Sequence, residues 1–497
     1  MMDSSKIISL EDFVRKENRY PSEEEALQWS LRLCDLLEEP GNGYRMLSPK
    51  NIYLENGNTW STANPPVTKD GSEAIFRAGA IIHFLLTRNP FRISHYLDGP
   101  PSIRERNPQI SVRFESIVLR LLQNVRALRY ASLQELREDL QQLQKELTGD
   151  WSVHWPAFKG NGTRTNHVNH TAFQPAGKTL KEVWKADIGD VWASAVMAGE
   201  YLFVGSGGGD FFSIDARTGK IIWKLALGAR VESTACIDGS VAYLGNDLGS
   251  FYAINIKNGS ILWKRNLGEY IRSSAYCDKT HVFVGSINPA QKTGMLWCLS
   301  REDGSVEWKR VMAPVFSSPV VDRGDIIIGS DDERLYSFTY TGSEKWRVGL
   351  TGKVRSTPLV IRDFVYVGAF GGLFYKIRRS TGEIIWKNTE AGAMYSSPAY
   401  GRSFIVAGNN AGVVNFFQQA TGKKSAEFAT GGPVTATPLV VNQYVLAGSN
   451  DGIFYILDST GKTVCTFDAK SPINSTACYH DPMIYVGSDN GFHALSF

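Results

Sequence analysis

Residues 196–227 read VMAGEYLFVGSGGGDFFSIDARTGKIIWKLAL, and this stretch decides the fold. Alternating apolar residues lead to Gly205, and a glycine-rich turn and a second, aromatic-rich segment follow. A Thr-Gly turn then leads into a third segment, which holds Trp223. Two-residue alternation between tight turns predicts short antiparallel strands. A further short strand precedes these three segments. The four strands together, with no helical period between them, are typical of a β-propeller blade.

The same pattern recurs to the end of the chain. Its marker is a glycine that closes the second strand of each repeat, and successive markers are 39 to 44 residues apart. The marker glycines are Gly205, Gly245, Gly285, Gly329, Gly368, Gly408, Gly448 and Gly487. Eight units of about 40 residues with four strands each predict an eight-bladed β-propeller.

The way the ring closes can also be predicted. The last repeat ends at Phe497 before it reaches its tryptophan-type outer strand, whereas an unpartnered strand of that type, at 180–186, precedes the first complete repeat. We therefore expect 180–186 to complete the blade that 474–497 begin, because closure removes exposed strand edges. The tryptophans should pack between blades, since each repeat buries its apolar face only against its neighbours. They are Trp184, Trp223, Trp263, Trp308, Trp346 and Trp386, with Ala426 and Cys465 at the next two positions.

These repeats resemble a known family. The stretch 213–223, SIDARTGKIIW, resembles the tryptophan-docking repeat of pyrroloquinoline-quinone (PQQ) enzymes, and 155–161, WPAFKGN, resembles the lead-in segment of that superfamily. The resemblance implies a propeller within 151–497, and many members with this fold are not enzymes. The PQQ dehydrogenases use two adjacent cysteines, a calcium-binding carboxylate cluster and an aspartate base. This sequence has no adjacent cysteines, so a PQQ-dependent oxidoreductase is the disfavoured alternative.

The first 150 residues lack the repeat. Helical periodicity predicts helices over 24–39 and 73–87, and a pair within 111–146. This region resembles the C-terminal lobe of bacterial Ser/Thr protein kinases in the order of its segments. YRMLSPKN at 44–51 stands where the family has His-Arg-Asp-Leu-Lys-Pro-Glu-Asn, and FRAGAIIHFLLTRNPF at 76–91 resembles the central helix.

The predicted domains follow from these two resemblances. A kinase C-lobe-like helical domain without an N-lobe occupies 1–147, an irregular linker spans 148–177, and the eight-bladed propeller covers 178–497. Trp151 and Trp155 are expected to hold the linker on the propeller surface.

Kinase chemistry is not expected. Phosphoryl transfer needs a lysine on the phosphates, a metal-binding carboxylate and an aspartate beside the acceptor hydroxyl. In the resembled loop, Met46 replaces that aspartate and Tyr44 the histidine, and no Asp-Phe-Gly follows Asn51. The resemblance therefore implies a pseudokinase-like domain, and we predict a protein with no catalytic residues, no cofactor and no metal.

Composition narrows the partners and the compartment. Of 497 residues, 43% are hydrophobic and 21% charged, and the net charge is +3, so a nucleic acid is not an expected partner. The six cysteines follow no disulfide or metal-binding pattern, which suggests a reducing compartment. No stretch of signal-peptide type or of membrane-spanning length is present. We predict a cytoplasmic, bacterial protein without membrane insertion.

Two smaller signals receive structural interpretations. His167 and His170 have a spacing that a metal could use, but a solvated linker is the preferred interpretation. Asp247, Asp331 and Asp451 follow marker glycines, where aspartate favours turns.

One set of positions is more informative. The residue before the small-residue opening of each innermost strand is large, charged or amide-bearing in most blades and varies from blade to blade. By repeat symmetry these residues should surround one mouth of the central channel. They are Trp192, Glu232, Arg272, Phe316, Arg355, Tyr395, Thr435 and Asn474.

Tryptophan, tyrosine and arginine, which hold four of these eight positions, are enriched at protein interface hot spots. A variable exposed loop position and a partner-binding face are equally weighted interpretations. The leading functional prediction is a scaffold or adaptor that binds unidentified proteins in a signalling or multi-protein system. The alternatives are a small-molecule sensor with its ligand at the channel mouth, the oxidoreductase above, and a factor like the outer-membrane barrel-assembly lipoprotein, which the propeller also resembles.

Overall fold

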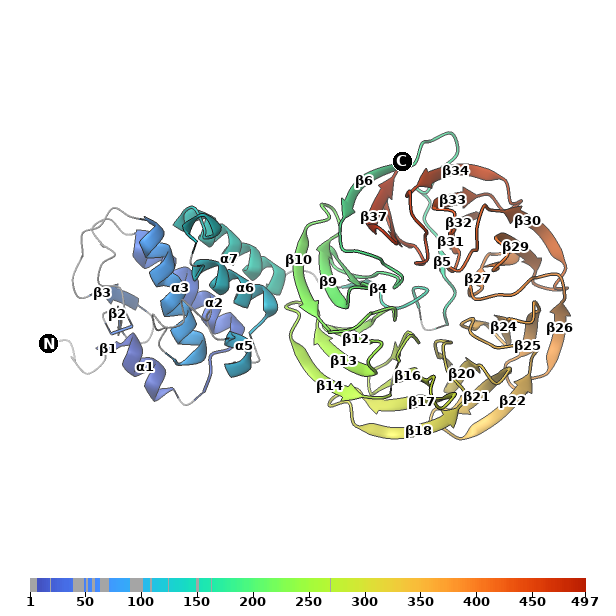
Figure 1. Ribbon diagram of the computed structural model, residues 1–497, viewed down its shortest axis with the longest axis horizontal. Coiled ribbons are helices and arrows are strands. Elements are labelled where there is room, and N and C mark those ends of the chain that lie inside the picture. Colours follow the sequence, from blue (N-terminus) through green and yellow to red (C-terminus); the bar gives the residue numbers. More distant parts are fainter. Residues whose placement is uncertain are drawn as a thin grey trace. The chain divides into compact units, whose positions relative to one another are not determined.

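The computed structural model describes residues 7–17, 19–38, 49–50, 52–55, 59–62, 71–89, 102–107, 110–123, 125–148, 152–161, 163–268 and 270–497. The chain forms two compact units. The first is made chiefly of residues 1–149, and the second of residues 150–497 apart from 257–260. Figure 1 shows helices in the first unit and a ring of sheets in the second.

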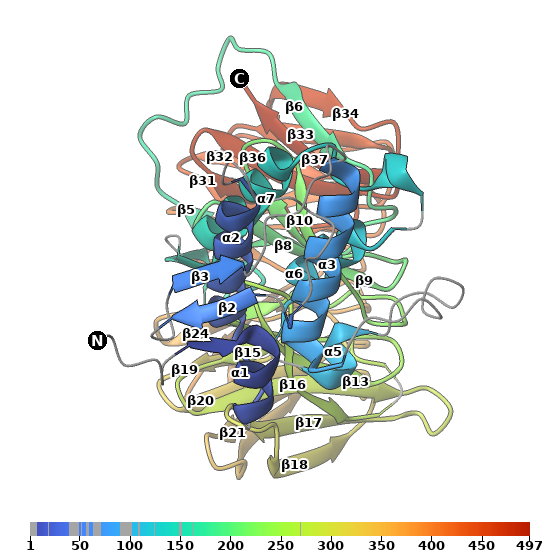
Figure 2. The same cartoon turned by 90° about the vertical axis from the view of Figure 1, so that its left-hand side faces the viewer.

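The first unit is mainly helical, and its helices confirm those predicted from periodicity. The apolar faces of the helices form one core around Leu33, Ile82, Phe114 and Leu136. The helices α2 and α3 lie side by side (Figure 2). The elements are β1 (Ile7–Ser9), α1 (Leu10–Lys16), α2 (Glu23–Glu38), β2 (Ile52–Glu55), β3 (Thr59–Thr62), α3 (Gly71–Thr87), α5 (Ile103–Arg106), α6 (Val112–Leu121), η3 (Arg126–Leu128) and α7 (Leu133–Thr148). The kinase-like loop at 44–51 lies mostly outside the described residues, and kinship with kinases stays a prediction.

The second unit is an eight-bladed β-propeller, as predicted, and each blade is a four-stranded antiparallel meander. The innermost strands are β7 (Val196–Ala198), β11 (Cys236–Asp238), β15 (Tyr276–Cys277), β19 (Val320–Asp322), β23 (Leu359–Ile361), β27 (Ala399–Tyr400), β31 (Leu439–Val441) and β35 (Cys478–His480). The second strands are β8 (Tyr201–Gly205), β12 (Val241–Gly245), β16 (His281–Asn288), β20 (Asp325–Ser330), β24 (Phe364–Gly368), β28 (Phe404–Gly408), β32 (Tyr444–Gly448) and β36 (Met483–Ser488).

The outer half of each blade follows the same order. The third strands are β9 (Asp210–Asp215), β13 (Ser250–Asn255), β17 (Thr293–Ser300), β21 (Arg334–Thr339), β25 (Phe374–Arg378), β29 (Val413–Gln418), β33 (Ile453–Leu457) and β37 (Gly491–Ser496). The outermost strands are β10 (Ile221–Ala226), β14 (Ile261–Asn266), β18 (Val306–Met312), β22 (Glu344–Gly349), β26 (Ile384–Asn388), β30 (Lys424–Ala429), β34 (Thr463–Asp468) and β6 (Lys181–Ala186).

The predicted closure is confirmed. Strand β6 pairs antiparallel with β37, so the eighth blade has the order β35-β36-β37-β6. Across this pair, Nδ1 of the buried His493 lies 2.6 Å from Oε2 of Glu182. The two ends of the propeller sequence therefore share one sheet, and no blade is left with an unpaired third strand.

The tryptophans pack between blades as predicted. The indole N–H of Trp223 donates to the carbonyl oxygen of Ile256 in the next blade over 3.1 Å, and Trp184 does the same to Ala216 over 3.0 Å. The Trp184 ring lies against Gly219, where a Cβ atom would come within 2.7 Å of the ring. Gly219 also has a positive φ of 74°. The glycine is needed both for the turn and for the close approach of the indole.

Residues 152–161 and 163–170, the channel segment, lie inside the ring. Strand β4 (Val153–Trp155) joins the inner edge of β7, and β5 (His167–Val168) joins that of β31 (Figure 1). Between them the carbonyl oxygens of Pro156, Thr163 and Thr165 accept backbone N–H groups from the innermost strands of blades 2, 5 and 6. The segment thus supplies acceptors to strand edges that face the channel.

The sequence predicts a linker held on the propeller surface, whereas this segment lies within the channel. Trp155 is buried, and Trp151 lies outside the described residues. The two histidines of this segment are half-buried and contact residues of the blades. Nδ1 of His167 lies 2.9 Å from the carbonyl oxygen of Tyr400, and Nδ1 of His170 lies 3.5 Å from Asp481 Oδ1. Hydrogen bonding to blade edges explains this placement, because a buried backbone needs partners.

The prediction that the cysteines form no disulfide was wrong. Cys236 on β11 and Cys277 on β15 form a disulfide between blades 2 and 3. They are 41 residues apart, close to one repeat, and their Cα atoms lie 6.3 Å apart because neighbouring innermost strands converge on the channel. No sequence spacing rule covers such a pair. The cytoplasmic location stays a prediction, and the cysteines no longer support it.

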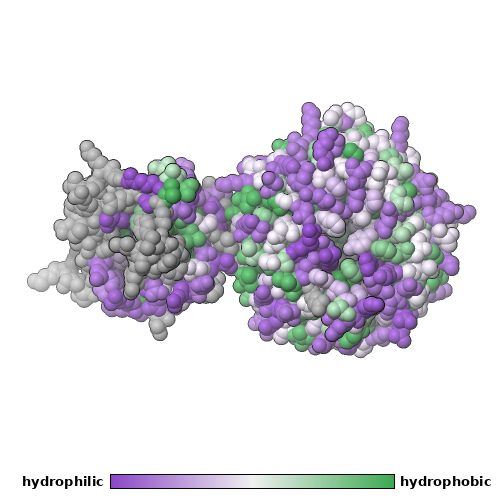
Figure 3. All heavy atoms as spheres, in the orientation of Figure 1, coloured by the Kyte–Doolittle hydropathy of each residue, from purple (hydrophilic) through white to green (hydrophobic). Residues whose placement is uncertain are grey.

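Hydrophilic and hydrophobic side chains are interspersed on the propeller face shown in Figure 3. The strongly apolar strand residues are instead buried between blades, as Val284, Leu299 and Val367 illustrate. Among the described helices, none is both long and apolar enough to cross a bilayer.

Candidate functional site

The loop that enters each innermost strand is fixed by the residue before the mouth position. In blade 2 this residue is Val231, which is fully buried against Gly205 of blade 1, where a Cβ atom would come within 2.3 Å of Val231 Cγ1. The pair Val191 and Gly487 repeats the arrangement between blades 1 and 8, at 2.4 Å. The marker glycines found in the sequence are therefore required, because the neighbouring blade fills the space of their side chain.

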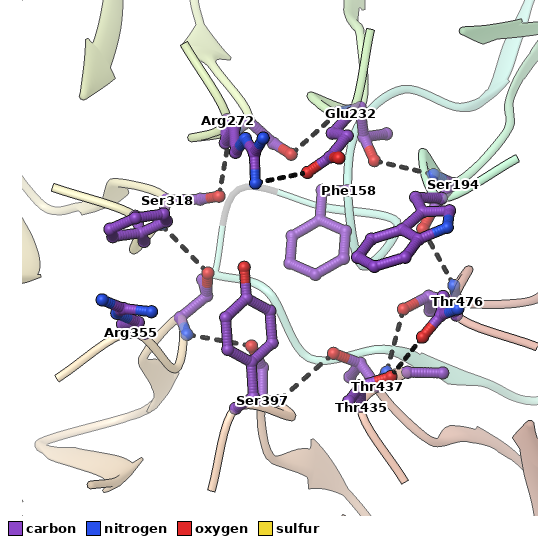
Figure 4. Close-up of a pocket in the computed structure, with 18 of the residues that line it drawn as sticks. Phe158, Ser194, Glu232, Arg272, Ser318, Arg355, Ser397, Thr435, Thr437 and Thr476 are labelled. Atoms are coloured by element: carbon purple, nitrogen blue, oxygen red, sulfur yellow. Dashed lines mark hydrogen bonds and ion pairs between the residues drawn. The ribbon is translucent and has the colours of Figure 1, made fainter. Parts of the chain in front are cut away.

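The predicted mouth residues lie together. All eight line one cavity of about 340 Å³ on the propeller axis, and we call them the mouth ring (Figure 4). Their members are Trp192, Glu232, Arg272, Phe316, Arg355, Tyr395, Thr435 and Asn474. The structure confirms their placement around one cavity, whereas their role in binding stays a prediction.

The two arginines of the mouth ring are held by aspartates. Nε and Nη2 of Arg272 bond the two carboxylate oxygens of Asp247 over 3.1 and 2.8 Å. Arg355 makes the same two-point contact with Asp331 over 2.9 and 2.7 Å. Such paired contacts fix the orientation of a guanidinium. From the sequence we predicted only a turn role for these aspartates, and their side chains also position the mouth.

Glu232 is the acidic member of the mouth ring. Its carboxylate lies 3.2 Å from Nη1 of Arg272 and 3.4 Å from Nη1 of Arg230. Arg230 in turn lies 2.8 Å from Asp190. Burial raises the pKa of Glu232, although the two arginines act to lower it. An alternating chain of charges therefore runs along one side of the mouth.

Aromatic side chains form much of the rest of the mouth ring. Trp192 and Tyr395 are 42% and 36% exposed, although large aromatic residues are usually more buried. The indole N–H of Trp192 donates to Asp489 over 2.9 Å. The guanidinium of Arg355 lies 4.0 Å from the ring centre of Phe316, a cation–π contact. These aromatic surfaces are open to a molecule that enters the mouth.

A ring of hydroxyl groups lies one layer below, and sequence reasoning missed it. The residue two positions after each mouth residue is serine or threonine, and its hydroxyl accepts the equivalent backbone N–H of the preceding blade over 2.9 to 3.3 Å. We call these eight residues the hydroxyl ring: Ser194, Thr234, Ser274, Ser318, Thr357, Ser397, Thr437 and Thr476. The signal was present in the sequence as a hydroxyl residue at one fixed position of all eight repeats.

The channel segment lies beyond the hydroxyl ring, away from the mouth. Its partners Ile237, Val360 and Tyr400 come five positions after their mouth residues, whereas the hydroxyl ring comes two positions after. Phe158 of this segment lines the cavity at its inner end, near the centre of the view in Figure 4. The cavity is therefore bounded by the mouth ring on one side and by the channel segment on the other.

The residues that line the cavity determine which groups it can bind. Two arginines, one glutamate, aromatic rings and hydroxyls offer hydrogen bonds and stacking surfaces. In the part of the chain that the structure describes, no three His, Cys, Asp or Glu residues are grouped to hold a metal ion.

The sequence matches one family model, described as outer membrane protein assembly factor BamB, over residues 168–275 and 264–349. The matched residues include the first four blades of the propeller. Curated proteins give no significant match to the sequence.

Solved structures share the fold. BamB from Moraxella catarrhalis is 18% identical with a TM-score of 0.56, and the match covers 64% of this chain and 100% of that one. A europium-containing methanol dehydrogenase is 12% identical with a TM-score of 0.60, covering 72% and 100%. Quinohemoprotein alcohol dehydrogenase from Comamonas testosteroni is 12% identical with a TM-score of 0.60, covering 69% and 80%. Identities this low show a common fold and leave activity open.

Proposed function

We propose that this protein is a non-catalytic scaffold that binds partner proteins at the mouth of its propeller channel. One observation carries the proposal. The mouth position differs from blade to blade, whereas the position before it is apolar and the position two after it bears a hydroxyl in every blade. Packing and ring closure explain the repeated positions, and neither explains the varied one. Aromatic residues and arginine at such a position are typical of interface hot spots.

The absence of catalysis is part of the proposal. It rests on the residues that replace the kinase aspartate and histidine, Met46 and Tyr44, and on the lack of adjacent cysteines of the PQQ dehydrogenase type. The family model that matches this chain is described as an outer membrane protein assembly factor, BamB. That name supports a binding role for the repeats, and the dehydrogenases of similar fold are too distant in sequence to support an oxidoreductase.

We extend the proposal to the helical unit as a second docking domain of the pseudokinase type. The order of α2, the β2–β3 hairpin, α3, α6 and α7 supports the resemblance to a kinase C-lobe. A protein-binding propeller joined to such a unit suits a signalling or multi-protein system.

A small-molecule sensor is the second candidate. A cavity of about 340 Å³ is within the range of ligand-binding pockets. A ligand held in the mouth would then compete with a partner protein.

Site-specific photo-crosslinking in the native host tests the scaffold proposal. A benzoylphenylalanine replaces Trp192 or Tyr395 at the mouth, and in a control it replaces Val306, which is 48% exposed on the outermost strand β18. We expect both mouth positions to capture one and the same protein that the control does not capture. Capture from Val306 alone would contradict a role for the mouth.

A further inference from the structure

The hydroxyl ring has unused donors. Each of its eight hydroxyl oxygens accepts one backbone N–H, and among the described residues none of the eight donates its own proton to a protein acceptor. A hydroxyl can donate one hydrogen bond and accept two. The side chains are 3–5% exposed and line the cavity. Eight buried donors therefore converge on one small volume that calls for an acceptor.

Two buried basic side chains belong to the channel segment, which lies beyond this ring. Lys159 and Arg164 of the channel segment are 0% exposed. Arg164 donates to the carbonyl oxygens of Phe158 over 2.6 Å and Ala275 over 2.8 Å, and Ala275 directly follows the hydroxyl-ring residue Ser274. Nζ of Lys159 has no hydrogen-bond partner among the described residues. Burial and the charge of Arg164 together lower the pKa of Lys159.

Buried charges are normally paired. Within the described residues, no acidic side chain is paired with either cation. The charged group that acts on Lys159 is Arg164. The inner end of the channel thus holds unused donors and the charge of Arg164 without an acidic partner among the described residues. A single negative group placed in the hydroxyl ring would accept the unused hydroxyl donors, and the two cations, which do not line the cavity, would act on it through their charge.

The mouth permits such a group to enter. The acid that lines the cavity, Glu232, is held by Arg230 and Arg272. Both arginines of the mouth ring have their guanidinium forks occupied by Asp247 and Asp331. A phosphate is usually bound through free arginine forks. The unused donors are hydroxyls, which suit the smaller charge of a carboxylate.

We propose that the hydroxyl ring is the binding site for a carboxylate, which an acidic segment of a partner protein inserts through the mouth. The inference rests on the proposed function, because it names the chemistry of the partner. A folded domain cannot enter a cavity of about 340 Å³, whereas one or two side chains of an extended peptide can. The exposed rings of Trp192 and Tyr395 would cover the peptide stem.

Isothermal titration calorimetry on the full chain at 150 mM salt tests the inference. The probes are hexaglutamate amide, hexaglutamine amide, acetate and inorganic phosphate. We expect saturable binding of hexaglutamate, with hexaglutamine at least tenfold weaker. Acetate or phosphate binding as tightly as hexaglutamate would overturn the peptide source. Equal binding of both peptides would overturn the need for a carboxylate.

Matched variants locate the site. Lys159→Met removes the buried cation without removing a hydrogen bond, and Lys353→Met removes an exposed cation that lies 3.6 Å from Asp331 near the mouth. Lys159→Met should weaken hexaglutamate binding more than tenfold, and Lys353→Met less than about twofold. Equal losses would reduce the effect to surface charge and overturn the inference. Thr357→Val, which removes a ring hydroxyl, should weaken binding, while Thr357→Ser should restore it.

Different results would contradict the scaffold proposal and the carboxylate-site proposal. If the mouth crosslinkers capture a protein but no acidic probe binds, the carboxylate site is wrong and the scaffold proposal stands. If acidic peptide binds and loses affinity in Lys159→Met, the carboxylate site is supported whatever the crosslinkers capture.

Discussion

The backbone N–H of Thr476 donates to the hydroxyl oxygen of Ser194 over 3.1 Å, although the two residues are 282 positions apart. Ser194 belongs to the first blade and Thr476 to the last. Seven equivalent bonds join consecutive blades, among them Ser194 to Thr234 and Ser274 to Ser318, at 3.0 and 2.9 Å. The Thr476–Ser194 bond closes the circle between the last blade and the first, so the ring around the cavity has eight equivalent links.

Ser194→Ala should lower the free energy of unfolding by about 1–3 kcal/mol, because it leaves the buried N–H of Thr476 without an acceptor. Urea denaturation measures the loss. Ser274→Ala removes the same bond at an internal junction and serves as the control. We expect the two losses to agree within about 1 kcal/mol. A much smaller loss for Ser194→Ala would mean that closure does not depend on this contact.

Lys159 and Arg164 offer a matched comparison inside the channel. Lys159→Met should raise the free energy of unfolding by about 1–3 kcal/mol at pH 7, because it removes a buried donor that has no partner in the described structure. Arg164→Met should give a less stable protein than Lys159→Met, since it leaves the carbonyl oxygens of Phe158 and Ala275 without their donor. Thermal unfolding of both variants at one pH decides the order. The reverse order would show that Lys159 is stabilising and has an unseen role in packing.

The effect of Lys159 on stability should depend on pH. Burial and the charge of Arg164 lower the pKa of Lys159 in the folded protein well below that of the unfolded chain, which is about 10.4. Between the two pKa values the unfolded chain binds more protons, so the free energy of unfolding of the wild type rises with pH. The advantage of Lys159→Met over the wild type should therefore shrink as the pH rises from 7 toward about 10. An advantage that stays constant over this range would contradict the buried, proton-losing lysine.

Much of this architecture follows from local repetition. The marker glycines such as Gly205, the docking tryptophans such as Trp223 and the closing strand with Trp184 each recur or stand out at a fixed spacing, so the blades and their closure could be predicted. The mouth ring followed from the same symmetry. The channel segment could not be predicted, because its partners are backbone groups of seven different blades. Asp247 was missed as a partner of Arg272 because the contact joins two loops 25 residues apart.

The disulfide gives a direct test of the cysteine correction. Reduction of Cys236–Cys277, which closes a loop of about 41 residues, should lower the free energy of unfolding by about 2–4 kcal/mol. The measurement compares chemical denaturation with and without dithiothreitol. Cys236→Ala should abolish the difference, whereas Cys465→Ala, which changes a cysteine outside the pair, should preserve it. Six free thiols in the native, unreduced protein would show that the pair does not form under those conditions.

Glu232 should contribute little to the stability of the fold. Its carboxylate contacts Arg272 and Arg230, and both arginines keep an aspartate partner, Asp247 and Asp190, when Glu232 is changed. Glu232→Gln should therefore alter the free energy of unfolding at pH 7 by no more than about 1 kcal/mol.

The pH dependence of the same variant has a definite sign. Burial raises the pKa of Glu232 above that of the unfolded chain, about 4.3. The folded wild type then binds more protons than the unfolded chain over that interval, so its relative stability is greatest at low pH and is lost as the pH rises through the folded pKa. Glu232→Gln should accordingly gain stability relative to the wild type between about pH 4 and pH 7. If urea denaturation shows the opposite trend, the arginines outweigh burial, and Glu232 is held chiefly as a structural ion pair.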